Sequence, residues 1–260
     1  MGILEAALLG LVQGLTEFLP VSSSGHLVLA ERLLGITQSG LAFEIWLHVA
    51  TLFAVAAALA REIGALCRGL VSPADPAERT RSWQFVLAIV VGTIPAALVG
   101  LTAKEAIEGA FASIRWVGVD LLFTALVLAA SRAFPGGQRQ ANPLRGFLVG
   151  VAQAVAILPG VSRSGMTLTA GLALGFSPAE AVRFSFLLAV PAILGAVVLD
   201  FAALRELGAA SPGALGAGFV TAALSGIVAI RLVWRLMQQG RLQIFAPYCA
   251  LLGLAALLLG

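Results

Sequence analysis

Two stretches, LPVSSSG (19–25) and LPGVSRSG (158–165), decide how this chain folds. Each interrupts a long apolar run, the first over residues 3–30 and the second over 146–175. Pro and Gly break a helical hydrogen-bond ladder, and hydroxyl and Arg side chains are costly in lipid, so neither run is expected to be one straight span. We expect two re-entrant helix-loop-helix hairpins, whose polar breaks line a protein-enclosed or wet cavity.

The composition places the rest of the chain in a bilayer as well. Its 260 residues are 60% apolar and 11% charged, with a mean hydropathy of +1.00, whereas soluble domains carry about 25% charged residues. Cys67 and Cys249 are too few and too far apart for a disulfide scaffold or a metal-thiolate cluster. No basic segment precedes the first apolar run, so we expect no cleavable signal peptide. The net charge of +3 then belongs to membrane loops, and we expect no nucleic-acid partner.

Windows of about 20 apolar residues, the length that crosses hydrocarbon as a helix, predict the spans. Six windows qualify, at 42–60, 84–102, 115–132, 180–200, 216–234 and 243–260. The predicted fold class is an all-α integral membrane protein with six transmembrane helices plus two re-entrant helix-loop-helix hairpins.

The loop charges predict the orientation of these spans. With six crossings, the loops 61–82, 133–145 and 235–242 share one side. That side and its edges hold ten arginines, namely Arg61, Arg68, Arg79, Arg81, Arg132, Arg139, Arg145, Arg231, Arg235 and Arg241. The opposite side holds Arg32, Lys104, Arg115 and Arg205. The positive-inside rule therefore predicts that the arginine-rich side is cytoplasmic and that both termini lie outside.

The two broken runs are copies of one another. GLVQGLTEFLPVSSSG (10–25) aligns with GVAQAVAILPGVSRSG (150–165) at an offset of 140 residues. Three predicted crossings separate the hairpins, and an odd number inverts the second copy, so the two breaks can meet near the midplane. We expect one membrane domain over 1–260, an inverted-topology repeat of about 1–135 and about 143–260, with one shared central site. The matched pairs are Gly10/Gly150, Gln13/Gln153, Val21/Val161, Ser22/Ser162, Ser24/Ser164 and Gly25/Gly165.

The first break carries an acid, several hydroxyls and an imidazole. Gln13 and Glu17 share a helix face one turn before it, and intramembrane acids are functional by default. Glu17 is predicted to be a metal ligand or a base, with capping of the serine loop as the alternative. The next turn opens a helix, whose free N–H groups attract phosphate, although a plain N-cap cluster would have the same sequence. Its polar residues are Ser22, Ser23, Ser24 and His26.

The second break places Arg163 where the first has Ser23. A guanidinium buried at a helix break needs an anion, and its planar fork suits phosphate oxygens. The alternative is a permanent structural ion pair with Glu17 across the repeat. We also expect diphosphate to bind to the hydroxyls around the two breaks, those of Ser22, Ser24, Ser162, Ser164 and Thr167.

Together these groups favour phosphoryl chemistry over sugar or hydride chemistry. Arg163 and the free N–H groups would neutralise phosphate oxygens, a divalent cation on Glu17 would bridge the diphosphate, and His26 would move the proton. His48 could line the same cavity, but the preferred interpretation is a histidine satisfied between helices. A secondary transporter or flippase for an anionic lipid or small anion is the alternative class, because carriers also use opposed broken hairpins. A scaffolding protein would have little reason to keep Arg163 at bilayer depth.

Two motifs, QGLTEFLPVSSSGHL (13–27) and PGVSRSGMT (159–167), resemble those of the undecaprenyl-diphosphate phosphatases, the bacitracin-resistance membrane enzymes of bacteria. FEIWLHVATLFAV (43–55), GTIPAALVGL (92–101) and FSFLLAVPAILGA (184–196) extend the resemblance over essentially the whole chain. It implies a membrane hydrolase that removes one phosphate from undecaprenyl diphosphate, recycles the lipid carrier of cell-wall synthesis and requires a divalent cation, Mg²⁺ or Ca²⁺.

Carried over residue by residue, the resemblance implies metal binding by Gln13 and Glu17. It implies catalytic roles for Glu17, Ser23, His26 and Arg163. Gln13 departs from members with Glu at both acidic positions, and a neutral amide cannot act as a base. The preferred mechanism has Ser23 attack the terminal phosphorus, and direct attack by an activated water is its close rival. The resemblance also implies a multi-pass protein of the bacterial inner membrane, among membrane lipids, with its active site facing the periplasm; a homodimer stays open.

Overall fold

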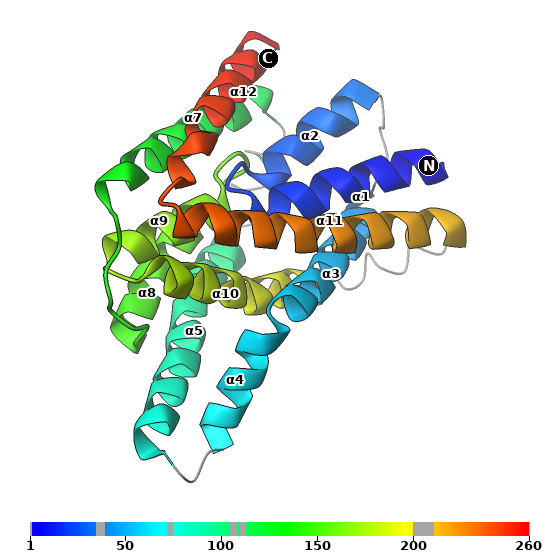
Figure 1. Cartoon of the computed structure of the whole chain (residues 1–260). Helices are drawn as coiled ribbons and strands as arrows, with labels where there is room; N and C mark the ends of the chain where they lie inside the picture. The colour runs from blue at the N-terminus through cyan, green and yellow to red at the C-terminus, as the bar shows by residue number, and fades with distance from the viewer. Residues whose placement is uncertain are drawn as a thin grey trace.

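The computed structural model describes residues 2–34, 40–71, 75–103, 109, 113–199 and 211–259. This part of the chain is helical, with one isolated β-bridge between Arg139 and Phe176 and no sheet (Figure 1). The all-α prediction is therefore confirmed for the described residues. Lys104, Arg205 and positions 200 and 260 of two predicted spans lie outside the described residues, and so does the side chain of Arg32.

Four described helices are long and apolar enough to cross a membrane, and each covers one predicted span. Ser113 and Ser211 cap two of them by accepting a hydrogen bond from a first-turn N–H group, and Asp75 caps a third. Proline at the first turn, where no donor is needed, accompanies two of these caps. The four are α5 (Pro76–Thr102), α7 (Ile114–Ala130) together with the 3-10 turn Ser131–Ala133, α10 (Pro178–Leu199) and α11 (Pro212–Gln238).

Two predicted spans take a different form. The span 42–60 is the first arm of a bent pair, in which α3 (Gly40–Ala58) and α4 (Ala60–Val71) meet at 70°. The span 243–260 begins with a 3-10 turn, so that α12 (Ala246–Leu259) is shorter than the helices that qualify as spans. The described residues thus give four candidate spans, or five with the bent pair, where the sequence predicted six.

Both interrupted runs break where the sequence predicts. The first gives α1 (Ile3–Phe18) and α2 (Ser23–Leu34), which extend from their break toward the same side in Figure 1. The second gives α8 (Pro143–Val155) and α9 (Arg163–Ala173). Each break contains a left-handed residue, Ser22 with φ 70° in the first and Gly160 with φ 101° in the second. This conformation turns the chain sharply and is rare for a residue other than Gly.

The helices pack in pairs through small residues. α1 packs mainly on α11, α8 on α5, and α7 on α12. A Cβ added at Gly14 would overlap the Ala222 carbonyl of α11, and one at Gly150 would overlap the Gly92 carbonyl of α5. Such close backbone approach is how membrane helices gain contact without a hydrophobic driving force between them. Phe18 of α1 meets Phe186 of α10 edge-on at 5.4 Å, which joins the first hairpin to the other half of the chain.

Candidate active site

The two breaks lie against each other in the middle of the helical bundle. Arg163 Nη2 of α9 donates to Glu17 Oε1 of α1 at 2.6 Å. Ser164 Oγ donates to the Leu19 carbonyl of the first break at 3.0 Å. Glu17 is 7% exposed, so its carboxylate would be costly there without a charged partner. The acid and the guanidinium that the sequence placed on separate hairpins therefore share one site.

Three more side chains lie close to the second carboxylate oxygen of Glu17. Ser23 Oγ donates to Glu17 Oε2 at 2.7 Å, and Gln13 Nε2 donates to the same atom at 3.0 Å. His48 of α3 brings its Nε2 atom to 3.8 Å from it. The serine hydroxyl is thus placed to pass its proton to a carboxylate, which is the contact that activates a nucleophile.

His48 contacts another helix and also lines the cavity. Its Nδ1 atom lies 2.8 Å from the Glu44 carbonyl of its own helix, and its Nε2 atom lies 3.8 Å from Glu17 Oε2 of α1. Both interpretations of His48, a histidine satisfied between helices and a residue of the cavity, therefore fit the structure. A lone histidine in an apolar helix gives no sequence signal of a carboxylate partner that is distant in the chain.

A cavity of about 290 Å³ opens at this junction. Alanines of α5 and α10 form its apolar wall, among them Ala96, Ala192 and Ala196. Arg163 Nη1 is buried there without a hydrogen-bond partner, so the guanidinium keeps donors for an anion. The predicted site residues that line the cavity are Glu17, Ser22, Ser23, Ser24, Ser162 and Arg163, and the chain adds Thr16, His48 and Gln153.

Two serines of the site also cap helices. Ser162 Oγ accepts from the Gly165 N–H group at 3.1 Å, and Ser22 Oγ accepts from the matching Gly25 N–H group at 3.3 Å. The N-cap alternative raised for the first break therefore holds for Ser22, and the structure shows the same role for Ser162; both serines line the cavity as well. The Ser23 hydroxyl instead donates its hydrogen bond to Glu17.

Three predicted site residues lie behind the cavity wall. Gln13 is fully buried behind Glu17, and its Oε1 atom has no hydrogen-bond partner. Ser164 bonds the first break, as described above. Thr167 Oγ1 lies 2.9 Å from the Arg163 carbonyl and 2.5 Å from Ser185 Oγ of α10. These contacts hold the two breaks and α9 in place. Diphosphate binding by Ser164 and Thr167 stays a prediction.

His26 also lies outside the cavity lining. Its Nδ1 atom is 2.7 Å from the Ser22 carbonyl, and its Nε2 atom is 2.6 Å from the hydroxyl of Tyr248 on α12. Because a carbonyl only accepts, Nδ1 donates, and Nε2 accepts from the hydroxyl when the ring is neutral. The rings of His26 and Tyr248 stack with centroids 5.6 Å apart. Proton transfer by His26 stays a prediction, and the geometry adds Tyr248, the single tyrosine of the chain, as its partner.

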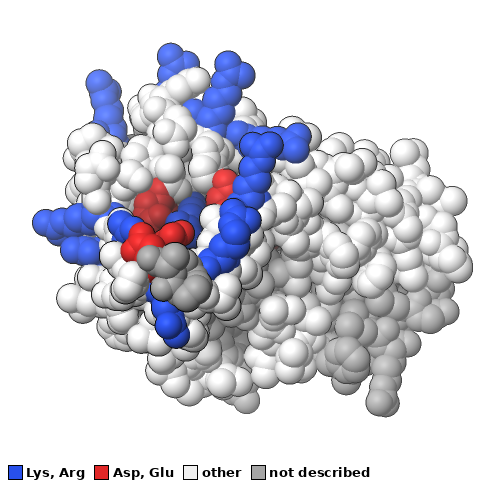
Figure 2. Space-filling view, turned by 60° about the horizontal axis from the view of Figure 1, so that its bottom comes forward, with Lys and Arg blue, Asp and Glu red and all other residues white. Residues whose placement is uncertain are grey.

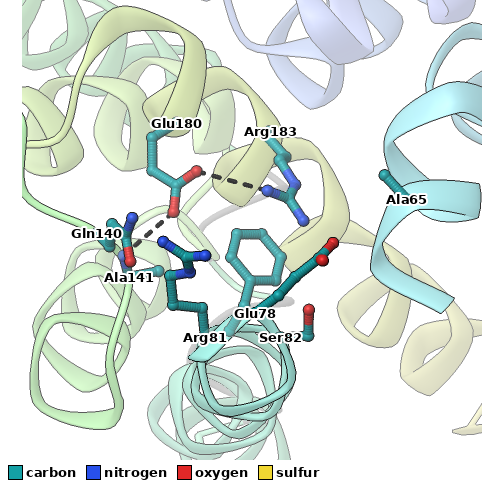
Figure 3. Close-up of a pocket in the computed structure, with 9 residues that line it drawn as sticks. Ala65, Glu78, Arg81, Ser82, Gln140, Ala141, Glu180 and Arg183 are labelled. Carbon is teal, nitrogen blue, oxygen red and sulfur yellow. Dashed lines mark hydrogen bonds and ion pairs between the residues drawn. The ribbon is translucent and has the colours of Figure 1, made fainter. Parts of the chain in front are cut away.

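A second cavity, of about 210 Å³, lies at the other end of α5 and α10 (Figure 3). Glu180 accepts there from the Ala141 N–H group at 3.1 Å and lies 3.8 Å from Arg183 Nη1. The Arg183 guanidinium sits 4.3 Å above the centre of the Phe85 ring. Acidic and basic side chains alternate around this cavity, and Figure 2 shows charged side chains gathered on this end of the molecule. Glu180 and Arg183 form a loose ion pair in it, and Arg183 Nε, like Arg163 Nη1, is buried without a hydrogen-bond partner.

Comparison with known proteins is consistent with this geometry. A family model described as bacitracin resistance protein BacA matches residues 6–255. The undecaprenyl-diphosphatase of Methanosphaera stadtmanae is 39% identical over 273 residues, which cover 100% of this chain and 98% of the relative. The undecaprenyl-diphosphatase of Desulfosudis oleivorans is 41% identical, with 99% and 98% covered, and that of Korarchaeum cryptofilum is 37% identical, with 99% of each covered. The chain belongs to the BacA family of bacitracin resistance proteins.

Proposed function

We propose that this protein is a membrane hydrolase that converts undecaprenyl diphosphate to undecaprenyl phosphate and inorganic phosphate. Its full-length relatives carry the name of that activity. The observation that carries the proposal is the contact between Arg163 and Glu17 at the junction of the two breaks, with Ser23 bonded to the same carboxylate. A nucleophile, a proton acceptor and a guanidinium within one small cavity are the parts that in-line phosphoryl transfer requires.

In the proposed mechanism, Ser23 Oγ attacks the terminal phosphorus and passes its proton to Glu17, with which it already shares a 2.7 Å hydrogen bond. The bond from that phosphorus to the bridging oxygen breaks, and undecaprenyl phosphate leaves. Arg163 keeps Nη2 on Glu17, donates from its unpaired Nη1 group to the phosphate oxygens, and stabilises the charge that spreads over them. Water then attacks the phosphoserine, the bond from phosphorus to Ser23 Oγ breaks, Glu17 returns its proton to that oxygen, and both protons of the water leave with inorganic phosphate as dihydrogen phosphate.

The residues present fit a divalent cation that the substrate helps to hold. Magnesium is usually bound through one or two carboxylates, several waters and substrate phosphates. Glu17 offers one carboxylate, and Gln13 Oε1 is a buried oxygen without a partner. The described residues contain no cluster of three or more His, Cys, Asp or Glu side chains that could hold the ion alone. Bound by Glu17 and Gln13 with the diphosphate, such a cation, Mg²⁺ or Ca²⁺, would neutralise phosphate charge.

The proposed architecture is one membrane domain with six crossings and two re-entrant hairpins, built from an inverted repeat of about residues 1–135 and 143–260. The packing supports it. α1 lies on α11 as α8 lies on α5, and these correspond if the second copy repeats the first in order. α7 and α12, the last helix of each copy, pack on each other, with Gly118 and Gly253 facing one another's carbonyls.

The proposed site opens to the periplasm of a bacterial inner membrane, away from the arginine-rich side. On α5, Arg81 lines the charged cavity and Ala96 lines the cavity of Glu17. The 15 residues between them correspond to roughly 22 Å of helix. The positive-inside rule makes the Arg81 end cytoplasmic, so Ala96 belongs to the outer half.

Phosphate release from purified, detergent-solubilised protein tests this function. We expect the parent protein to release phosphate from undecaprenyl diphosphate with Mg²⁺ or Ca²⁺ present and to stop when a chelator is added. Glu17→Ala should lower the rate by about 100-fold or more, because it removes both the proton acceptor and the partner of Arg163. No release from well-folded parent protein would contradict the proposal and favour a transporter of an anionic lipid.

Trapping of labelled phosphate on the protein separates the two mechanisms. We expect a phosphoserine that is absent from Ser23→Ala, and turnover of that variant should fall by about 100-fold or more. Ser24→Ala is the matched control for trapping, since the Ser24 hydroxyl lies 3.3 Å from Ser22 Oγ, whereas the Ser23 hydroxyl is the one that donates to Glu17; this variant should still form the phosphoserine. Near-normal turnover of Ser23→Ala would end the nucleophile role and leave direct attack by water.

A further inference from the structure

Gln153 of α8 is a buried polar side chain without a partner in the chain. It is 2% exposed, and neither Nε2 nor Oε1 makes a hydrogen bond. Most buried amides are paired, because desolvation without a hydrogen bond is unfavourable. Gln153 lines the same cavity as Glu17 and Arg163. A partner that binds in this cavity would account for its position.

The repeat explains why the side chain of Gln153 has no hydrogen-bond partner. Its counterpart Gln13 donates to Glu17, one turn further along the helix, at 3.0 Å. The position that matches Glu17 in the second copy is Ile157, which cannot accept a hydrogen bond. Gln153 therefore has the same amide as Gln13 but no carboxylate like that of Glu17 to accept its hydrogen bond. Ile157 also lines the cavity.

We propose that Gln153 is a substrate-binding residue whose Nε2 group donates to a non-bridging oxygen of the diphosphate. The inference rests on the proposed function and adds a contact to it. Its polar atoms are covered in the present arrangement, so the side chain turns toward the cavity to make this contact. A neutral amide is suited to this place, because it adds a donor beside Arg163 without a second positive charge to repel the guanidinium. It takes no part in proton transfer.

The test compares Gln153→Met with the parent protein in the phosphate-release assay and in thermal unfolding. Methionine keeps the length and flexibility of the side chain and removes both polar atoms. We expect kcat/KM for undecaprenyl diphosphate to fall by about 10- to 100-fold, as for the loss of a hydrogen bond to a charged group. We expect Tm to stay unchanged or rise, because an unpaired buried amide is replaced by an apolar group.

Thr169→Val is the matched control. Thr169 Oγ1 is also buried without a partner, but the residue does not line the cavity. Its variant should leave both kcat/KM and Tm at or above the parent values. Gln153→Glu keeps the shape and places a carboxylate against the diphosphate, so it should lose more activity than Gln153→Met.

Two outcomes would overturn the role proposed for Gln153, and a third would contradict the proposed function. A stable Gln153→Met protein that keeps kcat/KM within about threefold of the parent overturns the proposal, because a hydrogen bond to phosphate contributes more than that. A lowered Tm together with lost activity also overturns it, since the amide would then have a structural partner. Absence of phosphate release from the parent protein would instead contradict the proposed function itself.

Discussion

At the scale of single residues, the cost of polar groups in an apolar chain explains which site residues could be predicted. Glu17 and Arg163 stand in apolar runs, where only a function or a partner keeps a charge, and they prove to bond each other. His48, Gln153 and Tyr248 carry no such local signal. The role of each depends on residues of another hairpin or helix, and the sequence of its own segment does not predict those contacts.

Arg163→Lys tests whether the guanidinium fork matters beyond its charge. Arg163 uses Nη2 for Glu17 and keeps Nη1 without a partner, so it can hold the carboxylate and an anion together. A lysine ammonium is a point charge and cannot bridge both in this geometry. We expect kcat/KM for undecaprenyl diphosphate to fall by about 100-fold or more.

Arg183→Lys is the control for that substitution. Arg183 lies in the second cavity, at the other end of α10, where its link to Glu180 is a loose 3.8 Å contact. Its variant should stay within a few-fold of the parent, because exposed or loosely paired charges contribute little. An Arg163→Lys enzyme with turnover within a few-fold of the parent would argue against bidentate binding by Arg163.

At the scale of helices, the breaks could be predicted more reliably than the number of spans. Pro20 and Pro159, with the serines and glycines around them, break the ladder by local chemistry that any packing must respect. The bend between α3 and α4 falls at Leu59, at the end of the predicted span 42–60, and Arg61 and Glu62 follow it. The hydropathy window therefore finds α3 but gives no sign that α4 continues from it at 70°.

Helix pairing depends on the glycine contacts, and Gly150→Ala tests this. A Cβ at Gly150 meets the backbone of Gly92 on α5, which cannot rotate away as a side chain could. We expect the free energy of unfolding to fall by about 1–3 kcal/mol, as for overpacking in a core. Thermal or denaturant unfolding in detergent micelles measures the change.

Gly100→Ala is its matched control. Gly100 lies on α5 with nothing within 4 Å of an added Cβ. Alanine there should be neutral or slightly stabilising, by roughly 0.5–1 kcal/mol, because it favours the helix over the unfolded chain. Equal stability of the two alanine variants would mean that close contact between α8 and α5 is not needed for the fold.

At the scale of the whole molecule, the fold brings the two breaks together and places the second, charged cavity at the other end of α5 and α10. The sequence predicted the convergence from an odd number of crossings between two copies. That prediction holds although α3 and α4 meet at a 70° bend and α12 is short, because the contact between Glu17 and Arg163 depends on the breaks and their neighbours rather than on every span. Part of the cavity wall comes from α5 and α10, whose alanines lie in the segments 92–101 and 184–196 that the family resemblance had marked.

The orientation of this molecule can be tested with its own two cysteines. Cys67 is exposed on α4, on the arginine-rich side between Arg61 and Arg68. Cys249 is fully buried, with its thiol 3.6 Å from the Pro20 carbonyl, and serves as an internal control. Since positive loops stay in the cytoplasm, a membrane-impermeant maleimide should label the protein in inside-out vesicles and leave intact spheroplasts unlabelled. Cys67→Ser should abolish the signal. Labelling of Cys67 in intact spheroplasts would reverse the orientation and place the cavity of Glu17 and Arg163 in the cytoplasmic half.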